Sequence, residues 1–353
     1  MPPLISILLP TRNSSRFLKP RIDSILNQTT QDWELLIADS FSSDGTWETF
    51  QELAAQDPRV SVAQVPIGLY EAWNFLVRKA RGKYVYIATS DDEMENDCLE
   101  KMTRALEAHP ECDLCDSIIK LVDANGNEIS EESPSYVAHN WHVDFPQDIC
   151  HLRYAPHDFY LHLGGKTVYT SITQLLIRRK LFEKTGLFST TFGRSADYLW
   201  GMRAARYSNV VFLPEKLATW RIHENQITNA LDPAKVDASF HQMSQMALTA
   251  IGELKSRIMR RKALRIYKLI PFKETLLPAK RKRNLYYFFR SLVVSAFTHP
   301  VLLAEFMLHA LDEYRKRCPR RLWLIHSYDD MIRAHVRKLK LNKLIAYKGE
   351  SNE

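Results

Sequence analysis

The sequence predicts an α/β fold in which a mostly parallel sheet is flanked by helices and followed by a helical C-terminal extension. Short apolar runs rich in β-branched and aromatic residues, typical of strands buried on both faces, alternate with segments of helical period over the first half. Several runs end abruptly in polar residues, as strands do at the ligand-binding edge of an open sheet. From about residue 232 onward the chain is helical in pattern and basic, which marks the extension.

The first four strands and their helices follow one another in alternation. We expect strands at Leu4–Leu9, Glu34–Ala38, Val60–Val65 and Tyr84–Ala88. Helical spacing predicts helices that end near Leu26, Gln56 and Ala80. Alternation of this kind favours a parallel, doubly wound sheet, because each helix returns the chain to the start of the next strand.

The pattern loosens after residue 92. We expect helices at Cys98–Ala108, Arg179–Thr185 and Ala196–Tyr207, strands at Leu114–Leu121, Thr173–Ile177, Val210–Leu213 and Leu217–Ile222, and a tight turn at Asp123–Asn127. Residues 130–168 are rich in aromatic residues, His and Pro and show no clear period. A long irregular segment inside a domain is often a lid or a binding loop, so we expect a functional insert there. Ordinary packing of its aromatic rings is the alternative.

Two adjacent carboxylates, Asp91 and Asp92, directly follow the strand expected at Tyr84–Ala88. They cannot stay ionised inside a core without partners, so a position just past the strand end suits them. Hard oxygen ligands there suit Mg2+ or Mn2+, with diphosphate oxygens completing the coordination shell. The alternative is that the two residues simply open the next helix, as an N-cap and a first-turn acid.

The net charge of +7 is unevenly distributed. Residues 1–254 hold 24 Lys and Arg against 33 Asp and Glu, a net charge of −9, whereas residues 255–353 hold 24 against 8, a net charge of +16. Basic helices that also carry apolar residues suggest an anionic membrane surface as a partner. The alternative is a helical subdomain that packs on the body or on a second copy of the chain. No nucleic-acid motif accompanies the charge, so we expect no nucleic acid as a partner.

Composition also bears on the compartment. The first expected strand begins at Leu4, which leaves no room for a cleavable signal peptide, and no uncharged apolar run reaches the roughly 20 residues of a membrane span. The five cysteines are odd in number and irregularly spaced, as in a reducing compartment. We therefore expect a cytoplasmic protein, peripheral on the inner face of the cell membrane if its basic helices bind lipid.

Six segments occur in a recognisable order and spacing. They are Ile5–Asn13, Glu34–Thr46, Gly68–Asn74 with Ala80–Tyr84, Thr89–Asp92, Ser195–Trp200 and Trp220–Thr228. Together they resemble the family-2 glycosyltransferases over about residues 4–229. The resemblance implies a Rossmann-like GT-A catalytic domain at residues 1–232, with 130–168 as its acceptor-side insert, and a basic helical extension at residues 233–353.

The resemblance also implies roles for particular residues. Asp91 occupies the D-x-D position and would bind the metal, with His223 as a second candidate ligand; the alternative for His223 is a cap on a strand end. Asp197 would be the general base that takes the acceptor proton, the alternative being an early helix acid favoured by the helix dipole. The residues expected to bind the nucleotide sugar are Pro10, Thr11, Asn13, Asp39, Asn74, Ser90 and Asp92.

The implied reaction moves a sugar from a nucleotide-sugar donor, with a UDP-sugar as the expected class, to a glycan or lipid-linked glycan. A divalent cation, Mn2+ or Mg2+, would neutralise the departing diphosphate. A single base implies direct displacement with inversion at the anomeric carbon. Two departures from the family pattern bear on the site. Thr89 stands where many members carry the first Asp of D-x-D, and Ala196 stands where many carry Glu.

Two other functions are weighed against this one. A sugar nucleotidyltransferase would have a similar sheet, but it would carry a Gly-rich loop after the first strand, and Pro10–Asn13 contains no Gly. A non-catalytic scaffold that binds nucleotides or membranes would explain Thr89 and Ala196. Neither reading excludes a homo-oligomer.

Overall fold

The computed structural model describes residues 2–130, 148–163, 167–192, 196–224, 233–268, 285–298, 300–304, 306–307 and 337–347. Its helices are α1 (Ser15–Leu26), α2 (Thr46–Gln56), α3 (Leu69–Lys79), α4 (Cys98–Ala108), α6 (His157–His162), α7 (Leu181–Thr185), α8 (Ala196–Tyr207), α9 (Pro233–Gly252), α10 (Arg257–Tyr267) and α12 (Leu285–Thr298), with short 3₁₀ helices η1 (Ile172–Gln174) and η3 (Leu341–Leu344). Its strands are β1 (Ile5–Thr11), β2 (Trp33–Asp39), β3 (Val60–Gln64), β4 (Tyr84–Ile87), β5 (Cys112–Val122), β6 (Glu128–Ser130), β7 (His151–Arg153), β8 (Leu175–Arg178), β9 (Asn209–Arg221) and β10 (Ile345–Tyr347).

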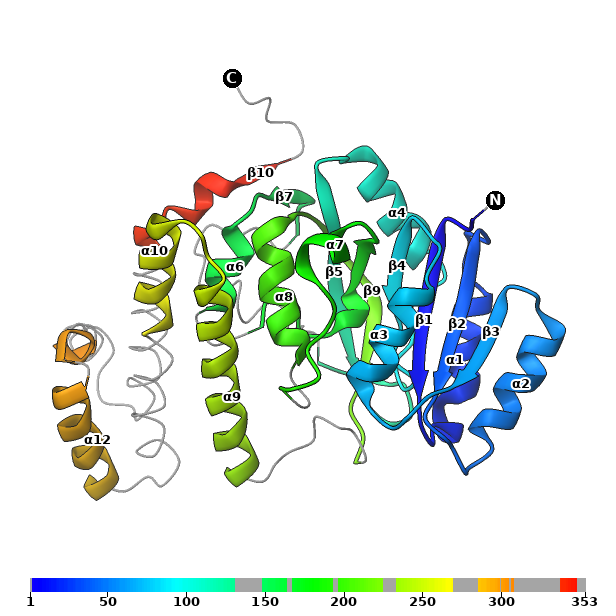
Figure 1. Ribbon diagram of the computed structural model, residues 1–353, viewed down its shortest axis with the longest axis horizontal. Helices are drawn as coiled ribbons and strands as arrows, with labels where there is room; N and C mark the ends of the chain where they lie inside the picture. Colours follow the sequence, from blue (N-terminus) through cyan, green and yellow to red (C-terminus); the bar gives the residue numbers. More distant parts are fainter. Residues whose placement is uncertain are drawn as a thin grey trace.

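One sheet contains all the described strands, in the order β10-β7-β9-β5-β8-β4-β1-β2-β3, with β6 paired to β5 (Figure 1). The pairs β3/β2, β2/β1, β1/β4 and β5/β9 are parallel. The pairs β4/β8, β8/β5, β9/β7, β7/β10 and β5/β6 are antiparallel. The predicted α/β sheet is therefore confirmed, but only four of the nine pairs between described strands are parallel, and three of those four lie in the run from β3 to β4.

The antiparallel strand β8 lies between β4 and β5 and determines the relative direction of the strands on its two sides. Because β8 is antiparallel to both of its neighbours, β5 runs in the same direction as β4, and β9 follows β5. The C-terminal ends of β1, β2, β4 and β9 therefore meet at one edge of the sheet, which Figure 1 shows at its lower side. We call this edge the catalytic edge below, since ligands of open α/β sheets bind beyond such ends.

The sheet separates two apolar cores. Alternate residues of β1 point to opposite faces, so Ile7 and Leu9 belong to one core and Leu8 to the other. Helices α1, α2 and α4 cover the first core, through side chains such as Ile25 and Leu99. Helices α3, α6, α7, α8 and α9 cover the second, in which Trp200 is 1% exposed. Burial on both faces explains the continuous apolar strands.

Two features differ from the expected element boundaries. The two strands expected at Val210–Leu213 and Leu217–Ile222 form the single strand β9, and the pairing of β9 with β5 shifts register around Pro214. Proline cannot donate to the ladder, and the irregularity accommodates it. The strand expected at Thr173–Ile177 starts later, at Leu175, because Ser171 caps η1 through a capping box with Gln174.

The described part of the segment 130–168 is ordered into core elements. Strand β7 pairs with β9, and helix α6 has buried side chains throughout. The remaining residues of the predicted insert, 131–147 and 164–166, lie outside the described residues. The role of the segment on the acceptor side stays a prediction.

The described helices α9 and α10 pack against the body. Met246 of α9 and Ile266 of α10 lie in the same core as α8, and Arg203 of α8 forms an ion pair with Glu253 at 2.6 Å. Strand β10 pairs with β7 and so returns the C-terminal segment to the sheet. The basic clusters at 280–283, 315–317 and 320–321 lie outside the described residues. Among the helices that are described, none is long and apolar enough to span a bilayer.

Candidate active site at the catalytic edge

The loop after β1 meets the loops after β2 and β4. The Thr11 hydroxyl donates to Ser14 Oγ at 3.1 Å, and the Ser14 hydroxyl donates to Ser90 Oγ at 2.9 Å. Asn13, at φ 49°, receives the Ser43 N–H on Oδ1 at 2.9 Å and donates its own N–H to Ser42 Oγ. Short polar side chains thus join segments that lie tens of residues apart.

Asp39 ends β2 in the same neighbourhood. Its carboxylate accepts the Ser42 N–H at 2.9 Å and the Ser42 hydroxyl, and the side chain is fully buried. Pro10 pairs in register with Ala38 in the adjacent strand, next to Asp39. The structure therefore brings Pro10, Thr11, Asn13 and Asp39 together, as the sequence predicts, and Ser90 joins them through Ser14.

Asp92 is buried behind the loop that follows β4. One carboxylate oxygen accepts the Arg221 N–H at 2.7 Å, and the other accepts the hydroxyl of Thr89. Burial, with the negative charge of neighbouring Asp91, raises the pKa of Asp92 to about 7. Thr89, where many family members carry Asp, thus holds Asp92 in place, and Asp92 itself ties the ends of β4 and β9 together.

Asp91 and His223 face each other across the same edge. His223 Nε2 lies 3.0 Å from Asp91 Oδ2, and the side chains are 10% and 25% exposed. The Phe17 ring packs beside His223, with ring centroids 4.7 Å apart. Carboxylate oxygen and imidazole nitrogen are both ligands of Mn2+, so this donor pair fits a divalent cation. The described residues contain no group of three or more such ligands, so donor phosphates or water would complete the shell.

Arg221 holds the loop that carries Asp91, one member of the Asp91–His223 pair. Its Nε donates to the Asp91 carbonyl at 2.8 Å, and its Nη1 donates to the carbonyls of Asp123 and Ala124 at 3.2 and 3.3 Å. Its Nη2 forms an ion pair with Glu93. The guanidinium is 3% exposed and therefore connects the loop after β4, the β5–β6 turn and the end of β9. The planar fork of Arg allows these separate contacts, which one ammonium group would not provide.

Asp197 lies in the first turn of α8 and is half-buried. Its Oδ1 accepts the Tyr70 hydroxyl at 3.0 Å and the Tyr198 N–H at 3.0 Å. Burial raises the pKa of Asp197, and the bond from Tyr70 opposes that rise. A carboxylate with a raised pKa is a stronger base, and its other oxygen remains available for a substrate proton.

Asn74 lies on α3 and, like Asp197, forms no hydrogen bond among the described residues to the predicted site residues at the ends of β1, β2 and β4. It is 6% exposed, its Nδ2 donates to the Phe188 carbonyl at 2.8 Å, and its Oδ1 accepts the Phe188 N–H at 2.9 Å. These bonds fix the backbone at Phe188, which precedes helix α8 and its residue Asp197 in the chain. The nucleotide-sugar role of Asn74 stays a prediction.

A polar cleft of about 800 Å³ lies beside the site, between α1, the residues after Asp92 and the β5–β6 turn. Arg221 and Phe17 line it, together with Glu93, Lys120 and Asn125. Neither Asp91 nor Asp197 lines it. The cleft is therefore adjacent to the predicted donor site and distinct from it.

Sequence reasoning missed two residues of the site, Tyr70 and Arg221. Both lie inside segments that carry the family resemblance, two residues after Gly68 and two residues before His223. Their partners, however, lie far away in the chain, with Tyr70 and Asp197 separated by 127 positions. Only the fold reveals these contacts.

A sheet of this topology with carboxylates at its catalytic edge is typical of the GT-A glycosyltransferases. The chain belongs to glycosyl transferase family 2, whose family model matches residues 6–186, half of the chain. It is an enzyme of the glycosyltransferase type.

Known relatives and structures agree with this assignment. Chondroitin synthase of Escherichia coli is 40% identical over 99 residues, 28% of this chain and 14% of that protein. The chain matches 40% or less of the length of the first four curated relatives. Residues 1–349 of S. aureus TarS in complex with UDP-GlcNAc align over 100% of this chain and 98% of that one, with a TM-score of 0.60 and 15% identity.

A second solved structure is the mannosyltransferase PcManGT of Pyrobaculum calidifontis in complex with GDP-Man and Mn2+. It covers 97% of this chain and 88% of its own, with a TM-score of 0.55 and 14% identity. At these identities both structural likenesses show the fold alone. They confirm the predicted GT-A architecture.

Proposed function

We propose that this enzyme transfers a sugar, with inversion and with the help of a divalent cation, from a nucleotide-sugar donor to a glycan or lipid-linked glycan. The observation that carries the proposal is the convergence of Asp91 and His223, 132 positions apart in the chain, at 3.0 Å on the catalytic edge. A histidine that only capped a strand end would not need a carboxylate partner beside the D-x-D position. The convergence therefore favours a ligand site.

The donor would bind across the ends of β1, β2 and β4. Thr11, Asn13, Asp39 and Ser90 supply hydroxyl, amide and carboxylate groups suited to a base and ribose. A UDP-sugar is the donor class we propose, because the TarS structures contain UDP and UDP-GlcNAc. A GDP-sugar is the competing class, since PcManGT contains GDP-Man.

Asp91 and His223 would hold the divalent cation. When bound, the cation neutralises the negative charge that develops on the departing nucleoside diphosphate. Asp92 and Arg221 do not need to touch the donor, because their bonds fix the loop on which Asp91 lies. The protein thus supplies a preorganised site rather than proton chemistry at the leaving group.

Asp197 would act on the acceptor. Its carboxylate accepts the proton of the attacking hydroxyl, and the Tyr70 hydroxyl fixes its orientation. Attack by the acceptor hydroxyl forms the new glycosidic bond as the bond from the anomeric carbon to the diphosphate breaks. A single displacement inverts the configuration. We place the acceptor beside the segment 130–168, in a catalytic domain that ends near residue 232.

The first experiment is thermal unfolding of the full chain with UDP, GDP and their sugar conjugates, with and without Mn2+. A ligand that binds only the folded state raises Tm by mass action. We expect one nucleotide to raise Tm, to do so more strongly with Mn2+, and to lose the Mn2+ increment in Asp91→Asn. A folded protein whose Tm responds to no nucleotide would overturn the proposal and favour a non-catalytic scaffold that binds membranes.

The second experiment measures turnover with the donor identified in this way. NMR of the product should show inverted anomeric configuration, and Asp197→Asn should abolish transfer while keeping the nucleotide-induced rise in Tm. Full transfer by Asp197→Asn would reject Asp197 as the base without affecting the donor assignment.

A further inference from the structure

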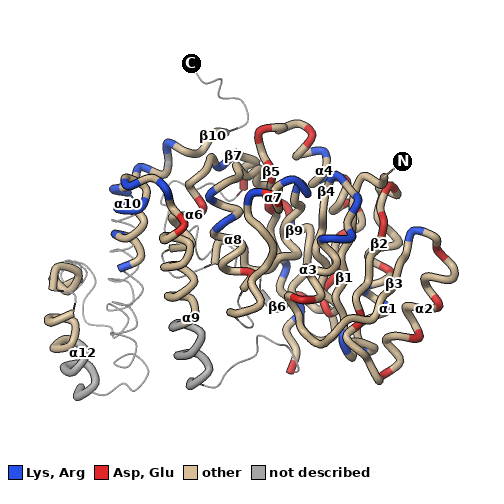
Figure 2. The backbone as a smooth tube through the Cα atoms, viewed as in Figure 1, with Lys and Arg blue, Asp and Glu red and all other residues tan. Residues whose placement is uncertain are grey.

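Helix α10 presents a dense cationic surface that the transferase chemistry does not use. From Lys255 to Lys268 the chain contains no acidic residue. The exposed cations of this stretch are Lys255, Arg257, Arg260, Arg261, Lys262, Arg265 and Lys268. Figure 2 shows Lys and Arg gathered on α10 and on the segment before β10.

The inner face of α10 is fixed to the body. Ala263 and Ile266 are buried in the core shared with α8 and α9, and the Tyr267 hydroxyl bonds Ser244 Oγ of α9 at 2.7 Å. Ser256 caps the helix by accepting the Met259 N–H. The sequence left two alternatives for these basic helices, packing on the body and binding to a membrane. The inner face of α10 packs on the body, and its outer face remains exposed.

The outer face of α10 has no partner of opposite charge in the described chain. No described carboxylate forms an ion pair with Arg257, Arg261 or Arg265. Like charges this close repel one another, which costs stability unless an anionic partner offsets the repulsion. A surface of this kind is therefore suited to an extended polyanion or to an anionic lipid layer.

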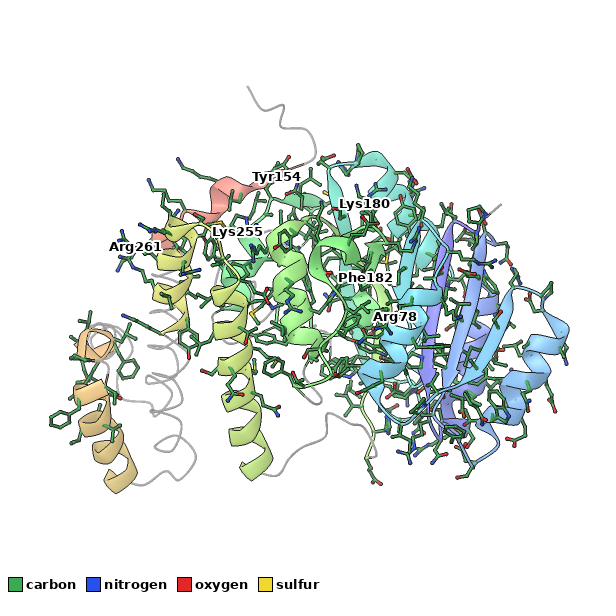
Figure 3. All side chains as sticks on the ribbon, in the orientation of Figure 1. Arg78, Tyr154, Lys180, Phe182, Lys255 and Arg261 are labelled. Carbon is green, nitrogen blue, oxygen red and sulfur yellow. The ribbon has the colours of Figure 1, made fainter. Side chains whose placement is uncertain are left out.

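A second cationic segment extends this surface. Arg337, Lys340 and Lys343 are exposed, and the segment is held to the body where the Tyr154 N–H donates to the Leu344 carbonyl at 2.7 Å. In Figure 3, Lys255, Arg261 and Tyr154 lie at the end of the molecule where α10 begins and β10 pairs with β7. The two cationic segments thus occupy one end of the molecule.

Apolar side chains on the same surface distinguish between the two kinds of partner. Ile258 is 70% exposed and Leu264 is 36% exposed, both among the cations of α10. A dissolved polyanion gains nothing from such groups, whereas the boundary between lipid headgroups and acyl chains accepts them. The combination favours lipid.

We propose that α10, with the cationic segment 337–343, docks the enzyme on a membrane surface that contains anionic lipid. The cations would attract phosphate-bearing headgroups, each contributing electrostatic attraction within a Debye length of the surface. Ile258 and Leu264 would enter the interface. This contact is peripheral and depends on salt concentration, and it involves no spanning helix.

The test is flotation of the full chain with vesicles of phosphatidylcholine alone and with vesicles that also contain phosphatidylglycerol. We expect binding only to the second kind, lost at high salt. The triple variant Arg257→Gln, Arg261→Gln, Arg265→Gln should bind about 100-fold more weakly, since each cation near the surface contributes about a factor of five. Ile258→Ser, which keeps the charge, should weaken binding about tenfold.

A matched control removes the same net charge elsewhere. The triple variant Arg78→Gln, Lys79→Gln, Arg104→Gln changes exposed cations of α3 and α4 and should bind as wild type does. Equal losses in the two triple variants, or no binding by wild type at low salt, would overturn the proposal. Tight binding to soluble chondroitin sulfate or DNA that Ile258→Ser leaves unchanged would also overturn it and assign the surface to a polyanion. Vesicle binding needs no substrate, so this proposal and the proposed function can fail separately.

Discussion

Arg221 and Arg153 are both almost wholly buried arginines, 3% and 1% exposed, and each forms an ion pair with a carboxylate far away in the chain, Glu93 and Asp116 respectively. Arg153 lies inside the body, where its guanidinium donates to Asp116 at 2.5 Å and to Asp158 at 2.9 Å. Gln174, Tyr169 and His157 bond those two carboxylates in turn. We call this group the sealed network, because its ion-paired side chains are at most 1% exposed.

The group around Arg221 differs in one respect. Its carboxylate Asp91 is 25% exposed and faces His223 at a strand end. A buried ion-pair network by itself is weak evidence for function, since it also specifies packing. The comparison shows that the useful signal is a partly exposed acid held by buried partners. Matched substitutions around Arg221 and in the sealed network test that difference.

The largest contrast compares Asp91→Asn with Asp116→Asn. We expect Asp91→Asn to lower kcat/KM about 1,000-fold, since it removes a proposed cation ligand, with little change in stability. We expect Asp116→Asn to cost about 3 kcal/mol of unfolding free energy and to leave kcat/KM of the folded enzyme unchanged. Steady-state kinetics and denaturant unfolding measure the two quantities. If Asp91→Asn and Asp116→Asn lost equal activity per folded molecule, the Arg221 group and the sealed network would not differ in function.

The second contrast replaces each arginine with lysine. Arg221→Lys keeps the charge but loses the separate contacts that hold the loop of Asp91, so we expect Mn2+-dependent nucleotide affinity to fall about 10- to 100-fold. Arg153→Lys should lower Tm at least as much as Arg221→Lys does, and it should leave the Mn2+-dependent nucleotide affinity unchanged. Hydrogen exchange should show faster opening of residues 89–93 in Arg221→Lys only. A purely structural Arg221 would behave as Arg153 does.

The third prediction concerns the base. Protonation of Asp197 should remove activity as pH falls through its pKa, which burial raises above the ordinary value near 3.8. The Tyr70 hydroxyl lowers that pKa, so Tyr70→Phe should raise it further and move the acid limb of kcat/KM to higher pH. A pH profile of both enzymes measures the shift. An acid limb at the same pH in wild type and in Tyr70→Phe would show that Tyr70 does not influence the pKa of the catalytic base.

The smallest effect concerns stability near the sealed network. Burial lowers the pKa of His151 to about 3 and of His162 to about 4, from an ordinary value of 6.5. Below pH 6.5 the unfolded chain therefore binds protons that the folded chain does not, and stability falls as pH decreases toward 4. The slope should reach about 1 to 3 kcal/mol per pH unit, and His151→Gln should reduce it. If the unfolding free energy of wild type and of His151→Gln fell with pH at the same slope, His151 would not contribute to the acid destabilisation.

The elements with apolar period could be predicted from the sequence, and the sealed network explains why others could not. Helix α4 begins and ends at the predicted residues, because its apolar side recurs at helical spacing. Strand β7 and helix α6 bury Arg153, Asp158 and His157, which carry no apolar signal. Their burial depends on Asp116, 37 positions before Arg153. Only tertiary pairing makes such residues interior.

The same reasoning applies to the site. Residues that end a strand within one segment, such as Asp39 and Asp91, are visible in the sequence as acids after an apolar run. The Tyr70–Asp197 and Arg221–Asp91 contacts join two segments each, and no local pattern encodes them. The parallel stretch β3-β2-β1-β4 followed from strand–helix alternation, whereas the reversed β8 and β7 follow connections that the sequence does not mark.

The distance between the catalytic edge and α10 has a consequence for the acceptor. Strands β1 and β9 end at the opposite end of the molecule from the start of α10 (Figure 1). An enzyme that rests on lipid through α10 would therefore hold these strand ends away from the bilayer surface. A sugar attached directly to a lipid headgroup would then lie far from the catalytic edge. The hydroxyl within reach would belong to the far end of a glycan that has already grown, so docking through α10 would set a minimum length for the acceptor.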